Sequence, residues 1–109
     1  MTRRASIVGT GLIGASVALA LRARGWTVTG VDNDEQRAAD ALAAGVIDGL
    51  GLDPAAELVV VAVPVLAVTA AVRSALAACP DAKVTDVGSV KASIVAAVEQ
   101  GRCTFVNIR

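Results

Sequence analysis

The sequence predicts an α/β fold in which a doubly wound, mainly parallel sheet forms a single domain over residues 1–109. Short β-branched runs alternate with helix-like segments, which is the pattern of parallel strands joined by right-handed crossovers. The run from Leu58 to Val63 is nearly continuous Val and Leu, as expected for a strand buried on both faces. A third observation is a glycine-rich turn directly after the first β-branched run. A chain of 109 residues is long enough for one core.

Composition excludes several classes of protein. The chain is 55% hydrophobic and 18% charged with a net charge of zero, which argues against disorder and against nucleic acid as a partner. The longest apolar run, from Leu58 to Ala71, is broken by Pro64, so no membrane span is expected. The N-terminus has no signal-peptide pattern, and we expect a cytoplasmic protein. Cys79 and Cys103 form no metal or redox motif and are interpreted as reduced structural cysteines.

The glycine-rich turn predicts an anion site. A glycine at Gly9 allows the tight turn, one at Gly11 lets a phosphate approach the backbone, and one at Gly14 lets the following helix pack against the strand. The N-terminus of that helix offers unpaired N–H groups and the positive end of the helix dipole, which suit a pyrophosphate. The candidate cofactor-binding residues of this turn are Gly9, Thr10, Gly11, Leu12, Ile13 and Gly14.

The second predicted strand ends at Asp32, eighteen residues after Gly14. An acidic residue at about this spacing completes the dinucleotide-binding fingerprint of the Rossmann fold, where it accepts hydrogen bonds from the adenosine ribose. The alternatives are a surface Asp in a turn without a ligand, or a helix cap, for which Asp34 is better placed. Arg37 is interpreted as a solvated helix residue rather than a partner of a 2′-phosphate. The predicted cofactor is therefore NAD.

The remaining elements follow from periodicity and from Gly and Pro positions. Strands are expected at 5–9, 26–31, 46–48, 58–63, 83–87 and 104–108, and helices at 12–24, 35–44, 65–78 and 90–99. Residues 49–57 are expected to form a loop with at most one helical turn. Ligands of such sheets bind beyond the carboxyl ends of the strands, so the turns after the strands should converge. Further cofactor-binding candidates on these turns are Asn33, Val63, Pro64 and Gly88, with Val63 and Pro64 either an apolar wall or simply a strand end.

Three blocks together carry a family resemblance: GTGLIGAS at 9–16, VAVPV at 61–65 and TDVGSVK at 85–91. In this order and spacing the chain, from about residue 6 to 106, resembles the nucleotide-binding domain of prephenate and arogenate dehydrogenases. The resemblance implies an NAD-dependent enzyme of tyrosine biosynthesis that oxidises and decarboxylates prephenate or arogenate. It also implies a catalytic role for Ser89, whose alternative is to cap the helix that follows.

The end of the chain departs from this family. After Phe105 and Val106 the family continues through a glycine into His-Pro-Met-Ala-Gly, whose His is the catalytic base, whereas this chain reads Asn107-Ile108-Arg109. The sequence contains no His and no Tyr. We therefore expect a fragment that lacks the helical substrate and dimerisation domain, is inactive alone, and belongs to a homodimeric enzyme. The alternatives are a stand-alone NAD-binding or regulatory module and another hydroxyacid-type dehydrogenase.

Overall fold

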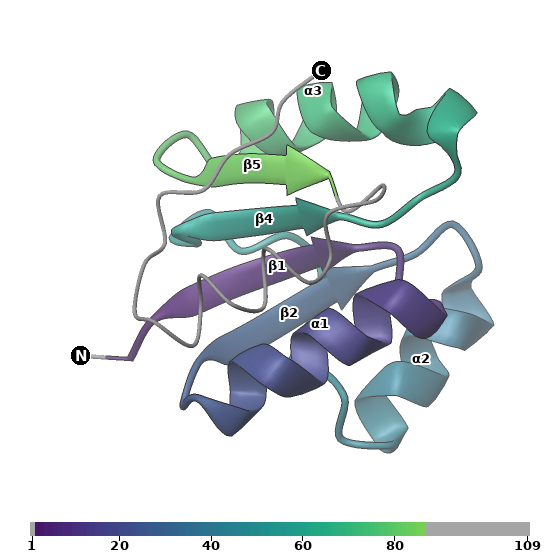
Figure 1. The fold of residues 1–109 in the computed structure, drawn as a ribbon, viewed down its shortest axis with the longest axis vertical. Helices are drawn as coiled ribbons and strands as arrows, with labels where there is room; N and C mark the ends of the chain where they lie inside the picture. The colour runs from purple at the N-terminus through teal and green to yellow at the C-terminus, as the bar shows by residue number, and fades with distance from the viewer. Residues whose placement is uncertain (1, 87–109) are drawn as a thin grey trace.

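The computed structural model describes residues 2–86, which form a five-stranded sheet with every pair parallel (Figure 1). The strands are β1 (Arg4–Val8), β2 (Thr27–Val31), β3 (Gly49–Leu50), β4 (Leu58–Val61) and β5 (Lys83–Asp86). Their order across the sheet is β3-β2-β1-β4-β5. The chain thus runs outward from β1 to β3 and then returns to the other side of β1. The prediction of a doubly wound parallel sheet is confirmed, with its switch point between β1 and β4.

Helices cover both faces of the sheet. They are α1 (Leu12–Ala23), α2 (Glu35–Ala43), the short 3₁₀ helix η1 (Val65–Ala67) and α3 (Val68–Ala78). Figure 1 shows α1 and α2 together on one face and α3 on the other. Side chains alternate along β4 as the pleat requires: Leu58 and Val60 pack with α1, while Val59 and Val61 pack under α3. All four residues of β4 are buried, as the apolar run predicted.

Both α1 and α2 end at a glycine with a positive φ, +86° at Gly25 and +76° at Gly45. In α2, the amide of the next residue, Val46, donates to the carbonyl of Ala41 at 2.9 Å, which is the long hydrogen bond of a Schellman motif. Val46 therefore closes the helix and does not begin a strand. The prediction of a third strand at 46–48 was wrong by about three residues, because the ladder with β2 begins only at Gly49.

A chain of polar contacts lies on the α3 face of the sheet. The buried hydroxyl of Ser6 is 2.7 Å from that of Thr29 and accepts a hydrogen bond of 3.0 Å from the amide of Asp53. The Asp53 carboxylate is paired with Arg4 at 2.6 Å, and its carbonyl accepts the thiol of Cys79 at 3.2 Å. Burial raises the pKa of the Cys79 thiol, and the charge of Asp53 adds to that effect. Cys79 is free and buried, as expected of a reduced structural cysteine.

Several sequence predictions lie outside the described residues: the helix at 90–99, the strand at 104–108 and the interpretation of Cys103. Among residues 2–86, no helix combines the length and the apolar character that crossing a bilayer requires. The same range holds no cluster of three or more His, Cys, Asp or Glu residues that could bind a metal ion.

Candidate functional site

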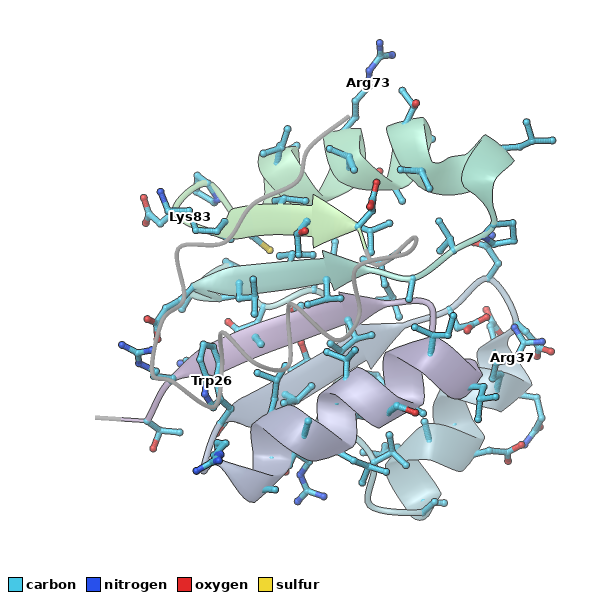
Figure 2. All side chains as sticks on the ribbon, viewed as in Figure 1. Trp26, Arg37, Arg73 and Lys83 are labelled. Carbon is cyan, nitrogen blue, oxygen red and sulfur yellow. The ribbon has the colours of Figure 1, made fainter. Side chains whose placement is uncertain are left out.

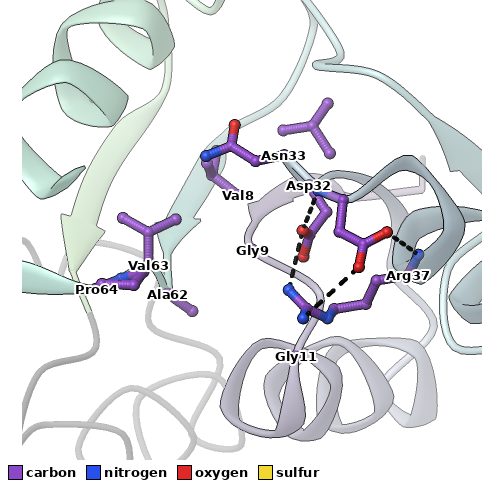
Figure 3. A pocket seen from close by; sticks show the side chains of 11 residues that line it. Val8, Gly9, Gly11, Asp32, Asn33, Arg37, Ala62, Val63 and Pro64 are labelled. Atoms are coloured by element: carbon purple, nitrogen blue, oxygen red, sulfur yellow. Dashed lines mark hydrogen bonds and ion pairs between the residues drawn. The ribbon is translucent and has the colours of Figure 1, made fainter.

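A cleft of about 510 Å³ opens at the carboxyl ends of β1, β2 and β4, which is the switch point of the sheet (Figure 3). Its lining residues come from three turns that are far apart in the sequence: Val8, Gly9, Gly11, Val31, Asp32, Asn33, Asp34, Arg37, Ala62, Val63 and Pro64. The predicted convergence of the turns that follow these strands is therefore found in the structure. Six predicted cofactor-binding residues line this cleft, namely Gly9, Gly11, Asp32, Asn33, Val63 and Pro64.

The three glycines of the first turn serve three different purposes. Gly9 has a φ of +96°, and a Cβ there would overlap the carbonyl of Ala62 at the end of β4. A Cβ at Gly14 would overlap the carbonyl of Gly9, so this position sets how closely α1 approaches β1. A Cβ at Gly11 would meet no atom within 4 Å, because it would stand in the open space of the cleft. Two of the glycines thus shape the turn, and the third leaves room for a ligand.

The N-terminus of α1 presents donors at this open position. Its cap is Gly11, so no side chain satisfies the first amides, and the first turn contains no acidic residue. The first amide bonded within the helix is that of Ala15, which donates to the Gly11 carbonyl at 2.8 Å. The unpaired N–H groups and the helix dipole both favour an anion beside Gly11.

On the other side of the cleft, the carboxylate of Asp32 is held at the end of β2. One oxygen accepts the amide of Thr10 at 2.8 Å and its hydroxyl at 3.1 Å, and the other accepts the amide of Asp34 at 2.8 Å. Burial by itself would raise the pKa of Asp32. The hydrogen bonds from Asp34 and Thr10, together with the charge of Arg37, outweigh it and lower the pKa of Asp32 below its ordinary value. Asp32 is therefore an ionised and oriented acceptor, while Asp34 accepts the amides of Gln36 and Arg37 as the cap of α2.

Arg37 differs from its sequence interpretation. Figure 3 shows its guanidinium over the cleft, and one nitrogen lies 3.2 Å from the Asp32 carboxylate. The side chain is 53% exposed, so it is partly solvated, but it also lines the site. The signal was present in the sequence: Arg37 lies in the first turn of a helix that starts three residues after Asp32, from where a long side chain can reach back.

A second hollow of about 280 Å³ adjoins the cleft on the α3 side and shares Val8, Val31, Asn33 and Val63 with it. Its other walls are Leu52, Ala67, Ala70, Ala71 and Ser74. Apart from Asn33 and Ser74, the lining is aliphatic. Sequence reasoning missed this hollow, because it forms only where η1 and α3 pack beside the loop that carries Leu52.

The remaining predicted site residues do not line the cleft. Thr10 is buried beneath it and acts on Asp32, while Gly14 is buried at the contact between α1 and β1. Leu12 and Ile13 are 87% and 43% exposed at the start of α1. Gly88 and the catalytic candidate Ser89 lie outside the described residues.

The comparisons with known proteins agree with this geometry. The family of prephenate dehydrogenase nucleotide-binding domains matches residues 17–108. The chain belongs to this family. None of the curated proteins with which it was compared matches the chain.

Among solved structures, this prephenate dehydrogenase-type domain is similar to Synechocystis arogenate dehydrogenase, with 31% identity, a TM-score of 0.71, and coverage of 87% of this chain and 37% of that one. It is also similar to the prephenate dehydrogenase of A. aeolicus in complex with hydroxyphenyl propionate and NAD⁺, with 28% identity and a TM-score of 0.71 over 82% and 34% of the two chains. The M. tuberculosis 3-hydroxyisobutyrate dehydrogenase shares the fold at 24% identity and a TM-score of 0.68, over 94% and 38% of the two chains. The chain thus spans little more than a third of the length of these structures.

Proposed function

We propose that this chain is the NAD-binding portion of a prephenate or arogenate dehydrogenase. One observation carries the proposal: a cleft at the switch point joins an open helix N-terminus at Gly11 to an ionised, oriented carboxylate at Asp32. A dinucleotide has a pyrophosphate and a ribose diol that match these two features in chemistry. The family match and the NAD⁺ bound to the A. aeolicus relative support the same proposal.

The pyrophosphate would lie against the backbone at Gly9 and Gly11, where the added bulk of a Cβ is absent and the first amides of α1 are unpaired. Leu12 and Ile13 would contribute backbone amides rather than side chains, which is consistent with the exposure of both side chains. Thr10 would act through Asp32, which it holds with two hydrogen bonds.

The adenosine would occupy the other half of the site. Asp32 would accept the ribose hydroxyls, because an ionised carboxylate at the end of β2 is the group that suits a diol. The aliphatic hollow beside Asn33 and Val63 would take the adenine ring, because its apolar walls can cover a planar base. Pro64 and Gly88 would then border the nicotinamide half, at the ends of β4 and β5.

The chemistry of the whole protein is a proposal that reaches beyond these residues. Bound NAD supplies the hydride acceptor for an oxidative decarboxylation of prephenate or arogenate. Ser89 would lie near the substrate hydroxyl, and the complete enzyme would be a cytoplasmic homodimer. These proposals follow from the family to which the chain belongs.

The test of cofactor binding is calorimetric titration of the 109-residue chain with NAD and with NADP. We expect saturable NAD binding and weaker NADP binding by about tenfold or more, since a 2′-phosphate would bring like charge against Asp32. An absence of NAD binding would refute the proposed function.

Catalysis by the 109-residue chain alone is expected to be absent. Oxidation of a ring alcohol needs a base within hydrogen-bond reach, which contributes roughly a hundred- to ten-thousand-fold to the rate. The chain contains no His or Tyr, and a serine hydroxyl is a weak base without an activating neighbour. NADH formation with prephenate and with arogenate measures this, and turnover by this chain would show that the chemistry has been misplaced.

A further inference from the structure

Loop 51–57 connects β3 to β4 and crosses the α3 face of the sheet without forming an α-helix. Its Leu52 and Ala56 pack with the apolar cluster under α3. A segment that crosses a sheet does not join a strand ladder, so its backbone amides need other acceptors. The amide of Asp53 donates to the hydroxyl of Ser6 at 3.0 Å, and this hydrogen bond is buried. The loop is thus tied to the middle of β1 by a side chain.

Two cross-strand pairs of β1 and β2 lie beneath the loop. Ser6 is the register partner of Thr29, and two residues further along each strand Val8 is the partner of Val31. Because side chains alternate along a strand, both pairs point to the same face of the sheet. The polar pair holds the loop through the hydrogen bond to Ser6, whereas the apolar pair lines the hollow together with Leu52. A wall of the hollow and its anchor are therefore adjacent.

The hydroxyl of Ser6 is the direct link between the loop and β1. Ser6 is the one polar side chain among the three buried residues of β1, and the other two pack in the core cluster under α1. An apolar residue at this position would leave the Asp53 amide without its acceptor, which is unfavourable for a buried group. The ion pair of Asp53 with Arg4 compensates little, because the Arg4 side chain is half exposed. The loop would then shift, and Leu52 is the residue next to the lost contact.

We propose that the hydrogen bond from the Asp53 amide to Ser6 sets the position of Leu52 in the wall of the hollow, and thereby how tightly the domain holds the base of a dinucleotide. Ser6 is a positioning residue: it is fully buried beneath the loop and acts on the ligand only through Leu52. The inference rests on the proposed function, because that function places the adenine in the hollow.

The experiment is calorimetric titration of four forms of the 109-residue chain: the natural chain, Ser6→Ala, Leu52→Ala and the double variant. The two ligands are NAD and nicotinamide cytosine dinucleotide, in which a smaller base replaces the adenine. Ser6→Ala should lower the affinity for NAD by about fivefold, the size of a lost hydrogen bond, and the affinity for the cytosine analogue by less than about twofold. Because Ser6 acts through Leu52, the double variant should bind NAD no more than about twofold more weakly than Leu52→Ala alone.

Trp26→Phe is the control for a general loss of stability. Trp26 is buried in the core cluster under α1, at the start of β2. Figure 2 shows it at the opposite end of the sheet from Arg37, which lines the cleft. The smaller ring should lower the melting temperature, because it leaves a cavity. It should change the ratio of the two affinities by less than about twofold.

The outcomes separate the two proposals. If the natural chain binds neither ligand, the proposed function fails and the inference fails with it. If the chain binds NAD but Ser6→Ala weakens both ligands equally, or its effect adds fully to that of Leu52→Ala, Ser6 is only structural. The inference is then overturned while the proposed function stands.

Melting without ligand shows whether Ser6→Ala is folded. If it is not, Ser6→Cys takes its place, since a thiol is of similar size and a weaker acceptor than a hydroxyl. Ser6→Cys should weaken NAD at least about twofold more than the cytosine analogue, and an equal effect on both ligands overturns the inference.

Discussion

The two halves of the cleft are built on opposite principles. The half at the glycine turn depends on the absence of side chains: Gly9 and Gly14 allow the backbone to pack closely, and Gly11 leaves the entrance of the cleft open. The half at the end of β2 works by placing charge, with Asp32 held among donors and faced by Arg37. The first half has almost no side-chain chemistry, whereas the second brings a carboxylate and a guanidinium together with the backbone amides of Thr10 and Asp34.

This difference predicts two kinds of response to mutation. A site defined by excluded volume is all-or-none, because an added carbon either fits or does not. A site defined by charge is graded, because each hydrogen bond contributes a limited share and solvent screens what is exposed. Substitutions in the glycine turn that clash should therefore cause large losses of stability or binding, whereas those around Asp32 should shift affinity by smaller factors.

The largest effect is expected for Gly14→Ala. Its Cβ would overlap the Gly9 carbonyl, so α1 and the turn would have to separate. Overpacking of this kind costs about 1–3 kcal/mol and occasionally more, and because the two nearest atoms belong to the Gly9 backbone we expect about 3 kcal/mol. In a domain of this size that lowers Tm by roughly 12 °C or more. Gly11→Ala is the matched control, since its Cβ meets nothing, and a Tm loss equal to that of Gly14→Ala would contradict the comparison.

Gly11→Val should separate binding from stability. The backbone at Gly11 has a φ of −72° and an extended ψ, which Val adopts without strain, so the melting temperature without ligand should hardly change. The side chain would fill the space in front of the α1 amides, and NAD affinity should fall by about a hundredfold or more. Thermal shift with and without NAD measures both quantities. Ala23→Val, at the exposed far end of α1, should keep the full NAD-induced shift.

Asp32→Asn tests the graded half. The amide has nearly the shape of the carboxylate but no charge, so the ribose hydroxyls would lose charge-assisted hydrogen bonds. The difference between a charged and a neutral hydrogen bond is about 1–1.5 kcal/mol, which corresponds to roughly a tenfold loss of NAD affinity. Calorimetry should show residual binding. A complete loss would place Asp32 with the all-or-none group and break the comparison.

The smallest effect is on the pH dependence of stability. The pKa of Asp32 is lower in the folded chain than its ordinary value of 3.8, so the folded state binds fewer protons there. Ionised Asp32 therefore stabilises the fold above about pH 3.8, and this contribution is lost as the pH falls through the lower pKa of the folded state. Melting of the natural chain and of Asp32→Asn across this range should show a gap that narrows on acidification. A gap that widens would mean that the Asp32 contacts are misassigned.

The sequence predicted the space-defined half better than the charge-defined half. A glycine at a turn has few interpretations, and Gly9, Gly11 and Gly14 each occupy the position that the fingerprint assigns. The order of strand and helix also followed directly from periodicity. A strand buried on both faces, such as β4, needs an apolar residue at every position, so it can be predicted from the sequence without tertiary information.

The interactions around Asp32 could not be derived in the same way. The predicted start of α2 put Arg37 within reach of Asp32, but whether its side chain turns outward or back to Asp32 depends on tertiary packing, which a list of residues does not contain. The position of β3 was missed for a related reason: the hydrogen bond from Val46 to Ala41 belongs to a helix end, and only geometry reveals it. The aliphatic hollow joins Leu52 to α3 across two connections, so no local pattern marks it.

The buried thiol of Cys79 can serve as a probe of local opening in this domain. Its sulfur is closed off at the end of α3 and donates to the carbonyl of Asp53, so a reagent can reach it only while that contact is open. The rate at which an alkylating agent labels Cys79 therefore counts opening events, in the way that amide exchange does for a backbone N–H. Cys79 lies on the face of the sheet opposite α1. On this face the ion pair of Arg4 with Asp53 and the hydrogen bond from the Asp53 amide to Ser6 hold the loop that carries Asp53. Labelling kinetics in the presence and absence of a dinucleotide would then show whether occupation of the cleft slows the opening of the contact between Cys79 and Asp53.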